Sequence, residues 1–130
     1  MGALDSIHAA LVGPMNRAGV PLLAGTDCPN PYVYPGFSLH DELGLLVRAG
    51  LTPAEALRTA TINPARFLGV TDSLGSVATG KVADLVLLEA NPLDDIANTK
   101  RIRAVIRGGR LLDRGALNQL LARAKTLAAN

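Results

Sequence analysis

The chain has 130 residues, a length that fits one compact domain, and 48% hydrophobic against 18% charged residues, which excludes a disordered chain. Its formal net charge of +2 is too small to indicate a nucleic-acid partner. No apolar run approaches the roughly 20 residues of a membrane span, and no signal peptide is visible. The single cysteine suits a reducing compartment. We therefore expect a cytoplasmic protein with no membrane partner.

The first part of the chain is predicted to begin with one helix and one buried strand. Apolar residues at three-four spacing predict a helix over 4–18, with a kink or break at Gly13-Pro14 and a glycine cap at Gly19. The almost continuous apolar run 20–26 predicts a strand covered on both faces, as in a parallel sheet. Asp27 follows directly and opens a proline-rich loop.

Capping signals mark the helices that follow this loop. Ser38 is a predicted N-cap, and Gly50 closes the helix that Ser38 begins. The segment Thr-Pro-Ala-Glu at 52–55 matches a capping box with proline at the first helical position. Asn63-Pro64 repeats the cap-then-proline signal, and Gly69 ends that short helix.

From residue 71 the pattern changes to strands and tight turns, so we divide the chain into 1–70 and 71–130. Strands are expected over 74–79, 83–89, 102–107 and 110–112, with a hairpin turn at Gly108-Gly109 and a last amphipathic helix over 117–127. The chain is therefore predicted to be of the α/β class. A parallel strand needs neighbours, and 1–70 offers no convincing one, so this part looks incomplete.

A set of short motifs follows in order along the sequence. Residues 19–27 carry Gly-Val-Pro-Leu-Leu-Ala-Gly-Thr-Asp. The others are SLHDEL at 38–43, GLTPAEAL at 50–57, ATINPA at 60–65, LGSV at 74–77, GKVADLV at 80–86, NPL at 91–93 and VIRGG at 105–109. Together they resemble the C-terminal part of the metal-dependent amidohydrolase superfamily, in an imidazolonepropionase-like or prolidase-like branch. The resemblance implies the last strand and following helices of a (β/α) barrel, then strands of a small β-sandwich and a terminal helix.

The resemblance also implies a metal site that Asp27 would share. Such enzymes hold one or two divalent metals, most often zinc, through a His-x-His pair, further histidines, a Lys or Glu, and the aspartate of the eighth strand. Asp27 matches that aspartate, and the resemblance gives it a metal-ligand role and the transfer of a proton from metal-bound water to the leaving group. The alternative for Asp27 is a turn residue after a strand.

Most of the expected ligands are absent from the sequence. It has two histidines, His8 and His40, and they form no His-x-His pair. A (β/α) barrel also needs about 250 residues. The resemblance thus implies the C-terminal fragment of a hydrolase acting on carbon–nitrogen bonds of cyclic or peptide-like amides, inactive alone. Whether this chain by itself is an enzyme, and whether it holds any metal, stays open.

Other candidate residues follow the predicted strand. His40 stands just past the loop, where a substrate-facing group would sit, although a plain surface histidine is the alternative. Tyr32 is predicted to line the substrate pocket, by analogy with loops after barrel strands. Cys28 has no base partner that would activate it. Asp84, after a tight turn, is expected to cap backbone N–H groups.

Two kinds of partner are expected. An N-terminal barrel portion would supply the missing histidines and strands to the fragment. Alternatively, a homo-oligomer would cover the strand at 20–26, whose edge would otherwise promote aggregation. In that case the chain would be a free-standing, non-catalytic scaffold or binding domain.

Overall fold

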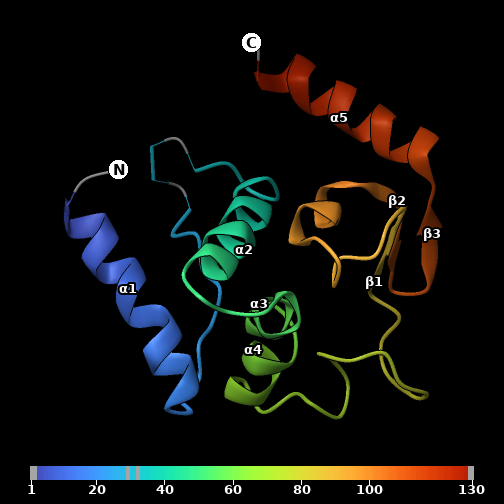
Figure 1. The fold of residues 1–130 in the computed structure, drawn as a ribbon. Helices are drawn as coiled ribbons and strands as arrows, with labels where there is room; N and C mark the ends of the chain where they lie inside the picture. Colours follow the sequence, from blue (N-terminus) through green and yellow to red (C-terminus); the bar gives the residue numbers. More distant parts are fainter. Residues whose placement is uncertain (1–2, 29, 32, 129–130) are drawn as a thin grey trace.

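The structure, a computed structural model, describes residues 3–28, 30–31 and 33–128 and has a mixed α/β fold. Figure 1 shows helices gathered on one side of the molecule and a small sheet with the last helix on the other. The elements in chain order are α1 (Ala3–Arg17), α2 (Ser38–Arg48), α3 (Pro53–Thr59), α4 (Ile62–Phe67), β1 (Leu85–Leu88), η1 (Ile96–Lys100, a 3-10 helix), β2 (Ile102–Arg107), β3 (Arg110–Leu112) and α5 (Arg114–Ala128).

Three helices end at the glycines that the sequence predicts. Gly19, Gly50 and Gly69 have φ angles of 79°, 103° and 69°, a left-handed conformation that suits a residue without Cβ. In each case the residue after the glycine donates its N–H to a carbonyl five residues back, which defines a Schellman motif. The pairs are Val20 with Met15, Leu51 with Leu46, and Val70 with Ala65. The prediction that glycines end these helices is confirmed, and it depends only on residues next to each helix end.

The predicted helix starts are right at one position and wrong at two. Thr52 and Glu55 form the expected capping box, in which Glu55 Oε2 accepts from the Thr52 N–H at 2.7 Å. Ser38 is not the N-cap of α2, because its hydroxyl accepts the N–H of Tyr34 at 2.7 Å instead. Asn63 lies inside α4, and its side-chain amide donates to the Leu22 carbonyl at 2.9 Å.

Of the kink or break expected at Gly13-Pro14, the break is wrong, because α1 continues through Pro14 to Arg17, and the kink stays a prediction. Gly13 is buried, and a Cβ added to it would lie 2.8 Å from the Ala49 carbonyl oxygen at the end of α2. This close backbone contact holds α1 against α2. Packing of this kind outweighs the hydrogen bond that Pro14 cannot make.

Residues 20–26 are extended but form no strand, contrary to the prediction. Among the described residues no parallel neighbour lies beside them, and the sheet consists of β1, β2 and β3 alone. Their polar groups pair with the helices instead: Ala24 donates its N–H to the Thr59 carbonyl at 3.0 Å, and the Leu22 carbonyl accepts from Asn63. The apolar run therefore marks a segment that packs along the helices without the expected strand ladder.

The sheet is antiparallel, in the order β1-β2-β3. Arg107 pairs with Arg110 around Gly108-Gly109, which confirms the predicted hairpin. Asp84 accepts the Gly108 N–H at 2.6 Å, which confirms its capping role and ties β1 to the turn. The strand expected over 74–79 is wrong, and the one expected over 83–89 is limited to Leu85–Leu88.

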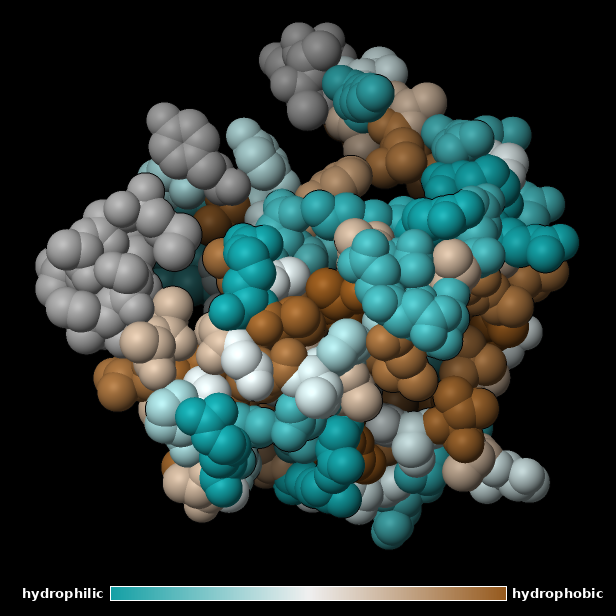
Figure 2. Space-filling model, in the orientation of Figure 1, coloured by the Kyte–Doolittle hydropathy of each residue, from teal (hydrophilic) through white to brown (hydrophobic). Residues whose placement is uncertain are grey.

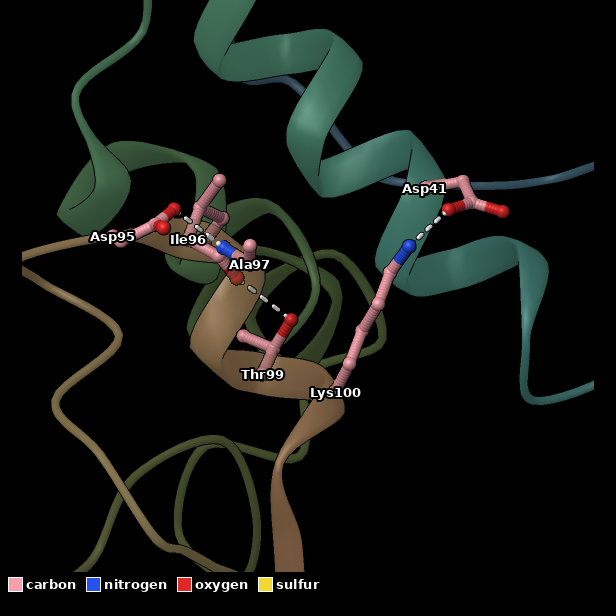
Figure 3. A network of polar contacts seen from close by, with 6 residues as sticks. All are labelled: Asp41, Asp95, Ile96, Ala97, Thr99 and Lys100. Carbon is pink, nitrogen blue, oxygen red and sulfur yellow. Dashed lines mark hydrogen bonds and ion pairs between the residues drawn. The ribbon is translucent and has the colours of Figure 1, made fainter.

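The core joins the helices to the second part of the chain. Leu43 of α2, Ala56 of α3 and Ile96 of η1 form one buried cluster, with exposed fractions of 4%, 0% and 8%. Figure 3 shows the adjacent polar link, in which Lys100 at the end of η1 reaches across to Asp41 on α2. The division at residue 70 stays a prediction, and the cluster spans it.

Candidate functional site

Asp27 lies directly after the extended segment, in a tight turn with an exposed side chain. Its φ angle is 53°, and it is the one non-glycine residue with positive φ among the described residues. Asp tolerates this region because its short side chain bonds locally. Here Oδ2 accepts from Asn30 Nδ2 at 2.5 Å, and the Asp27 carbonyl accepts the Asn30 N–H at 3.2 Å. The carboxylate thus sits at the end of the segment, held by its own turn.

Glu42 on α2 holds the backbone just before this turn. Its Oε1 accepts the Gly25 N–H at 2.8 Å, across 17 residues of sequence. Its Oε2 is buried and has no hydrogen-bond partner among the described residues. The sequence analysis did not single out Glu42, although it lies in the SLHDEL motif two residues after His40.

The residues around Asp27 do not make a metal centre by themselves. Within residues 3–28, 30–31 and 33–128, no three His, Cys, Asp or Glu side chains come together in a way that could hold an ion. A structural or catalytic zinc needs three or four protein ligands. Asp27 offers one carboxylate, already engaged by Asn30, so the donor set of this chain does not fit such a metal.

His40 lies on the wall of an open groove of about 500 Å³ between α2 and α5. Figure 2 shows apolar side chains exposed beneath α5 on this side of the molecule. The lining is mostly apolar, with a few polar groups, and consists of Pro35, Gly36, Phe37, His40, Asp41, Lys100, Ile102, Val105, Arg114, Leu117, Leu120 and Leu121. Asp27 does not line this groove, so the structure does not bring Asp27 and His40 into one pocket.

The charge state of His40 is set by its surroundings in this groove. Burial lowers the pKa of the imidazole below its ordinary value, and the positive charge of Lys100 lowers it further, while Asp41 opposes the shift. This shift favours the neutral imidazole over its charged form. Its Nδ1 is buried and has no partner in the described part of the chain, so a hydrogen-bonding position is open there.

Arg114, at the start of α5, is a second cation in the groove lining besides Lys100, and sequence reasoning missed it. Its Nη1 donates to the Ile102 carbonyl at 3.0 Å and its Nε donates to Asn118 Oδ1 at 3.1 Å, which anchors α5 to β2.

Tyr32, predicted to bind substrate, lies outside the described residues. Cys28 is exposed, and its thiol donates to the Val33 carbonyl oxygen at 3.7 Å.

Comparison with known proteins places the chain in a family. The family model described as "Amidohydrolase family" matches residues 6–112. The chain belongs to the amidohydrolase family. Proteins of that family are generally metal-dependent. The recognition from sequence motifs is confirmed. The match stops before α5, which begins at Arg114.

Among the curated relatives, an imidazolonepropionase of Geobacillus kaustophilus is 38% identical over 99 residues, which cover 73% of this amidohydrolase chain and 23% of the relative. The ochratoxinase of Aspergillus niger is 38% identical over 114 residues, 84% of the chain and 23% of that protein. The chain thus spans about a quarter of the length of these relatives.

Solved structures agree with this assignment. The crystal structure of A. niger ochratoxinase superposes with a TM-score of 0.69 at 35% identity, over 85% of the amidohydrolase chain and 26% of the other. A Xaa-Pro dipeptidase with methionine bound in its active site gives 0.72 at 30% identity, over 81% and 25%. No helix among the described residues is long and apolar enough to cross a membrane.

Proposed function

We propose that this chain is the C-terminal part of a metal-dependent hydrolase that cleaves a carbon–nitrogen bond in an amide substrate. The observation that supports it is the position of Asp27, an exposed carboxylate directly after the extended segment 20–26 and inside the family match. In a complete barrel this segment would be the last strand, and such barrels have their active sites at the C-terminal ends of the strands. Relatives named Xaa-Pro dipeptidase and phenylurea hydrolase support a small amide-like substrate.

Asp27 is this chain's share of the catalytic centre. A carboxylate in that position can accept a proton and return it during hydrolysis. The divalent metal, zinc by resemblance, would be held mainly by donors outside this chain, because no three potential ligands come together among the described residues. The chain alone is therefore proposed to be inactive. His40 and Tyr32 stay predictions as substrate-binding residues.

The partner is proposed to be a polypeptide carrying the other strands of the barrel. Large apolar side chains that such strands and their helices would cover are exposed, among them Leu23 at 43%, Leu68 at 68% and Phe67 at 78%. A second copy of the chain is the competing arrangement. Light scattering after size exclusion separates the two. A homo-oligomer is larger than the 13.5 kDa of one chain when the chain is alone, whereas the other arrangement exceeds this mass only after the barrel polypeptide is added.

The decisive experiment combines metal content with hydrolysis. The chain is incubated with zinc, freed of excess metal and assayed on a panel of amides, alone and with the first three quarters of the G. kaustophilus imidazolonepropionase. We expect neither retained zinc nor hydrolysis from the chain alone, and both from the mixture. Asp27→Asn should abolish hydrolysis in the mixture, whereas Asp72→Asn, at another exposed aspartate, should not. Zinc held by the chain alone and unaffected by Asp27→Asn would overturn the proposal.

A further inference from the structure

Glu42 is a half-buried carboxylate whose bonding does not satisfy it. Its Oε1 accepts from the Gly25 N–H at 2.8 Å, while its Oε2 is buried with no hydrogen-bond partner among the described residues. Placing a carboxylate oxygen away from water without a partner costs free energy. A group kept in such a position calls for an explanation in terms of what it holds.

What Glu42 holds is the last part of the segment that leads to Asp27. Two earlier contacts tie the segment to the helices, one from Asn63 to the Leu22 carbonyl and one from the Ala24 N–H to Thr59. The Gly25–Glu42 bond is the next contact along the chain, and Asp27 follows two residues later. From there the chain turns, with the Asp27 carbonyl accepting the Asn30 N–H.

Glu42 is also well placed to act as a fixed support. It is adjacent on α2 to Leu43, which is 4% exposed and belongs to the core cluster with Ala56 and Ile96. A hydrogen bond to an ionised acceptor is stronger than one between neutral groups. In a parallel sheet the N–H of Gly25 would pair with a neighbouring strand. Here the carboxylate on a helix provides the acceptor.

We propose that Glu42 is a positioning residue for Asp27: by holding the Gly25 amide against α2, it fixes where the chain turns and therefore where the Asp27 carboxylate lies. The proposal deepens, and rests on, the proposed role of Asp27 in hydrolysis. Glu42 acts through the backbone of residues 25–27 and does not itself react. Without this bond, the position of the Asp27 carboxylate would vary.

The test is nuclear magnetic resonance on the whole chain in four forms: wild type, Glu42→Ala, Glu42→Gln and Asp41→Ala, the last a matched acidic residue on the same helix. Hydrogen exchange of the Gly25 amide reports the bond itself. The side-chain amide signal of Asn30 reports the Asp27 turn, because it donates to Asp27 Oδ2. Asp27→Ala gives the Asn30 signal for a fully lost contact. Two amides report stability: Ala56, bonded to the Thr52 carbonyl, for the helical part, and Gly109, bonded to the Ala83 carbonyl, for the hairpin.

We expect Glu42→Ala to speed Gly25 exchange on the order of tenfold or more and to move the Asn30 signal most of the way to its position in Asp27→Ala. Glu42→Gln, which keeps an acceptor oxygen, should restore most of both, and Asp41→Ala should change neither. Faster exchange of the Gly25 amide with an unmoved Asn30 signal would overturn the positioning role of Glu42. So would equal acceleration at Ala56 or Gly109, which would indicate a loss of stability rather than of one contact.

The glutamine variant keeps the test decisive if the alanine variant does not fold. In Glu42→Gln the weaker neutral acceptor should speed Gly25 exchange a few-fold and shift Asn30 in the same direction, with both stability reporters unchanged. None of these signals depends on enzymatic activity. Failure of the hydrolase proposal, seen with Asp27→Asn in the mixing experiment, is therefore distinguishable from failure of the role of Glu42.

Discussion

Lys100 Nζ lies 2.5 Å from Asp41 Oδ1, an ion pair that joins η1 to α2 across 59 residues of sequence. Figure 3 shows the lysine extending from the end of η1 toward the carboxylate. Both side chains are more than half exposed, so the pair adds little to stability. Its effect is electrostatic and local, because Lys100 lies beside His40 on the wall of the groove.

Removing this lysine should change the titration of His40. Lys100→Ala takes away a positive charge that lowers the pKa of the imidazole, and it leaves Asp41, which raises that pKa, without its partner. We therefore expect the pKa of His40 to rise in Lys100→Ala, as followed by the pH dependence of its ring proton signals. Arg101→Ala is the control, since Arg101 faces Glu89 at 3.7 Å. An unchanged His40 titration in Lys100→Ala would contradict the influence of the Lys100 charge on His40.

The stability of the chain should fall on mild acidification because of the same histidine. Burial holds the folded-state pKa of His40 below its unfolded value of about 6.5. The unfolded state then binds the proton more readily, so the stabilisation is complete above that pH and is lost as the pH falls toward the folded pKa. Lys100 opposes protonation and Asp41 favours it. Arg114 is the other charged residue that lines the groove.

Thermal unfolding between pH 7.5 and 5 measures this effect. We expect the midpoint of the wild type to fall with pH, and to fall less in His40→Gln, which cannot take up a proton. The carboxyl of Asp41 titrates lower, because the hydrogen bond and charge of Lys100 hold its pKa below the ordinary value, so Asp41 acts in a more acidic window. Parallel curves for wild type and His40→Gln would show that His40 is not the group responsible.

The sequence predicted those features of the fold that depend on neighbouring residues. The capping box at Thr52 and Glu55, the helix ends at Gly19 and Gly50, and the Gly108-Gly109 hairpin each need a few consecutive residues, and all are confirmed. The strand over 20–26 was wrong because a strand is defined by a neighbour that these described residues do not supply.

The candidate site shows the same limit. The sequence located Asp27 at the end of an extended segment, since the apolar run stops abruptly there. It did not locate Glu42, because a contact across 17 residues has no local signal. Nor could it show that His40 faces a groove made with α5. Arg114, the first α5 residue in the lining, lies 74 positions after His40 in the sequence, from 40 to 114.

Gly75 and Gly80 allow backbone strain and packing to be separated. Their φ angles are almost the same, 89° and 87°, so alanine is strained at both. A Cβ at Gly75 would lie 2.6 Å from the Ala65 Cβ and 3.1 Å from Ile62 Cα, whereas nothing lies within 4 Å at Gly80. Overpacking adds roughly 1–3 kcal/mol to a conformational cost of about 1 kcal/mol.

We therefore expect Gly75→Ala to lower the free energy of unfolding by roughly 2–4 kcal/mol and Gly80→Ala by about 1 kcal/mol. Urea titration followed by circular dichroism measures both. Equal losses would mean that residues 71–80 do not pack against α4 in solution. A larger loss at Gly80 than at Gly75 would be incompatible with the contacts at both positions.

Leu43 offers a test of whether residues 1–70 and 71–130 unfold together. It is 4% exposed and packs with Ala56 of α3 and with Ile96, which lies in the second part of the chain. Leu43→Ala leaves a cavity and should cost about 2–5 kcal/mol. Because the cluster joins both parts, amides in each should lose protection by the same amount. Suitable reporters are Ala56, bonded to the Thr52 carbonyl, and Gly109 of the hairpin.

Leu45 on the same helix is 46% exposed, so Leu45→Ala is the matched control and should change neither reporter by more than a small amount. Equal losses at Ala56 and Gly109 in Leu43→Ala would show one cooperative unit despite the change in sequence pattern near residue 70. Loss at Ala56 with full protection at Gly109 would instead mean that the sheet and its hairpin are stable independently of the helices. In that case Lys100–Asp41 and Leu43–Ile96 would be contacts between two separately folding parts.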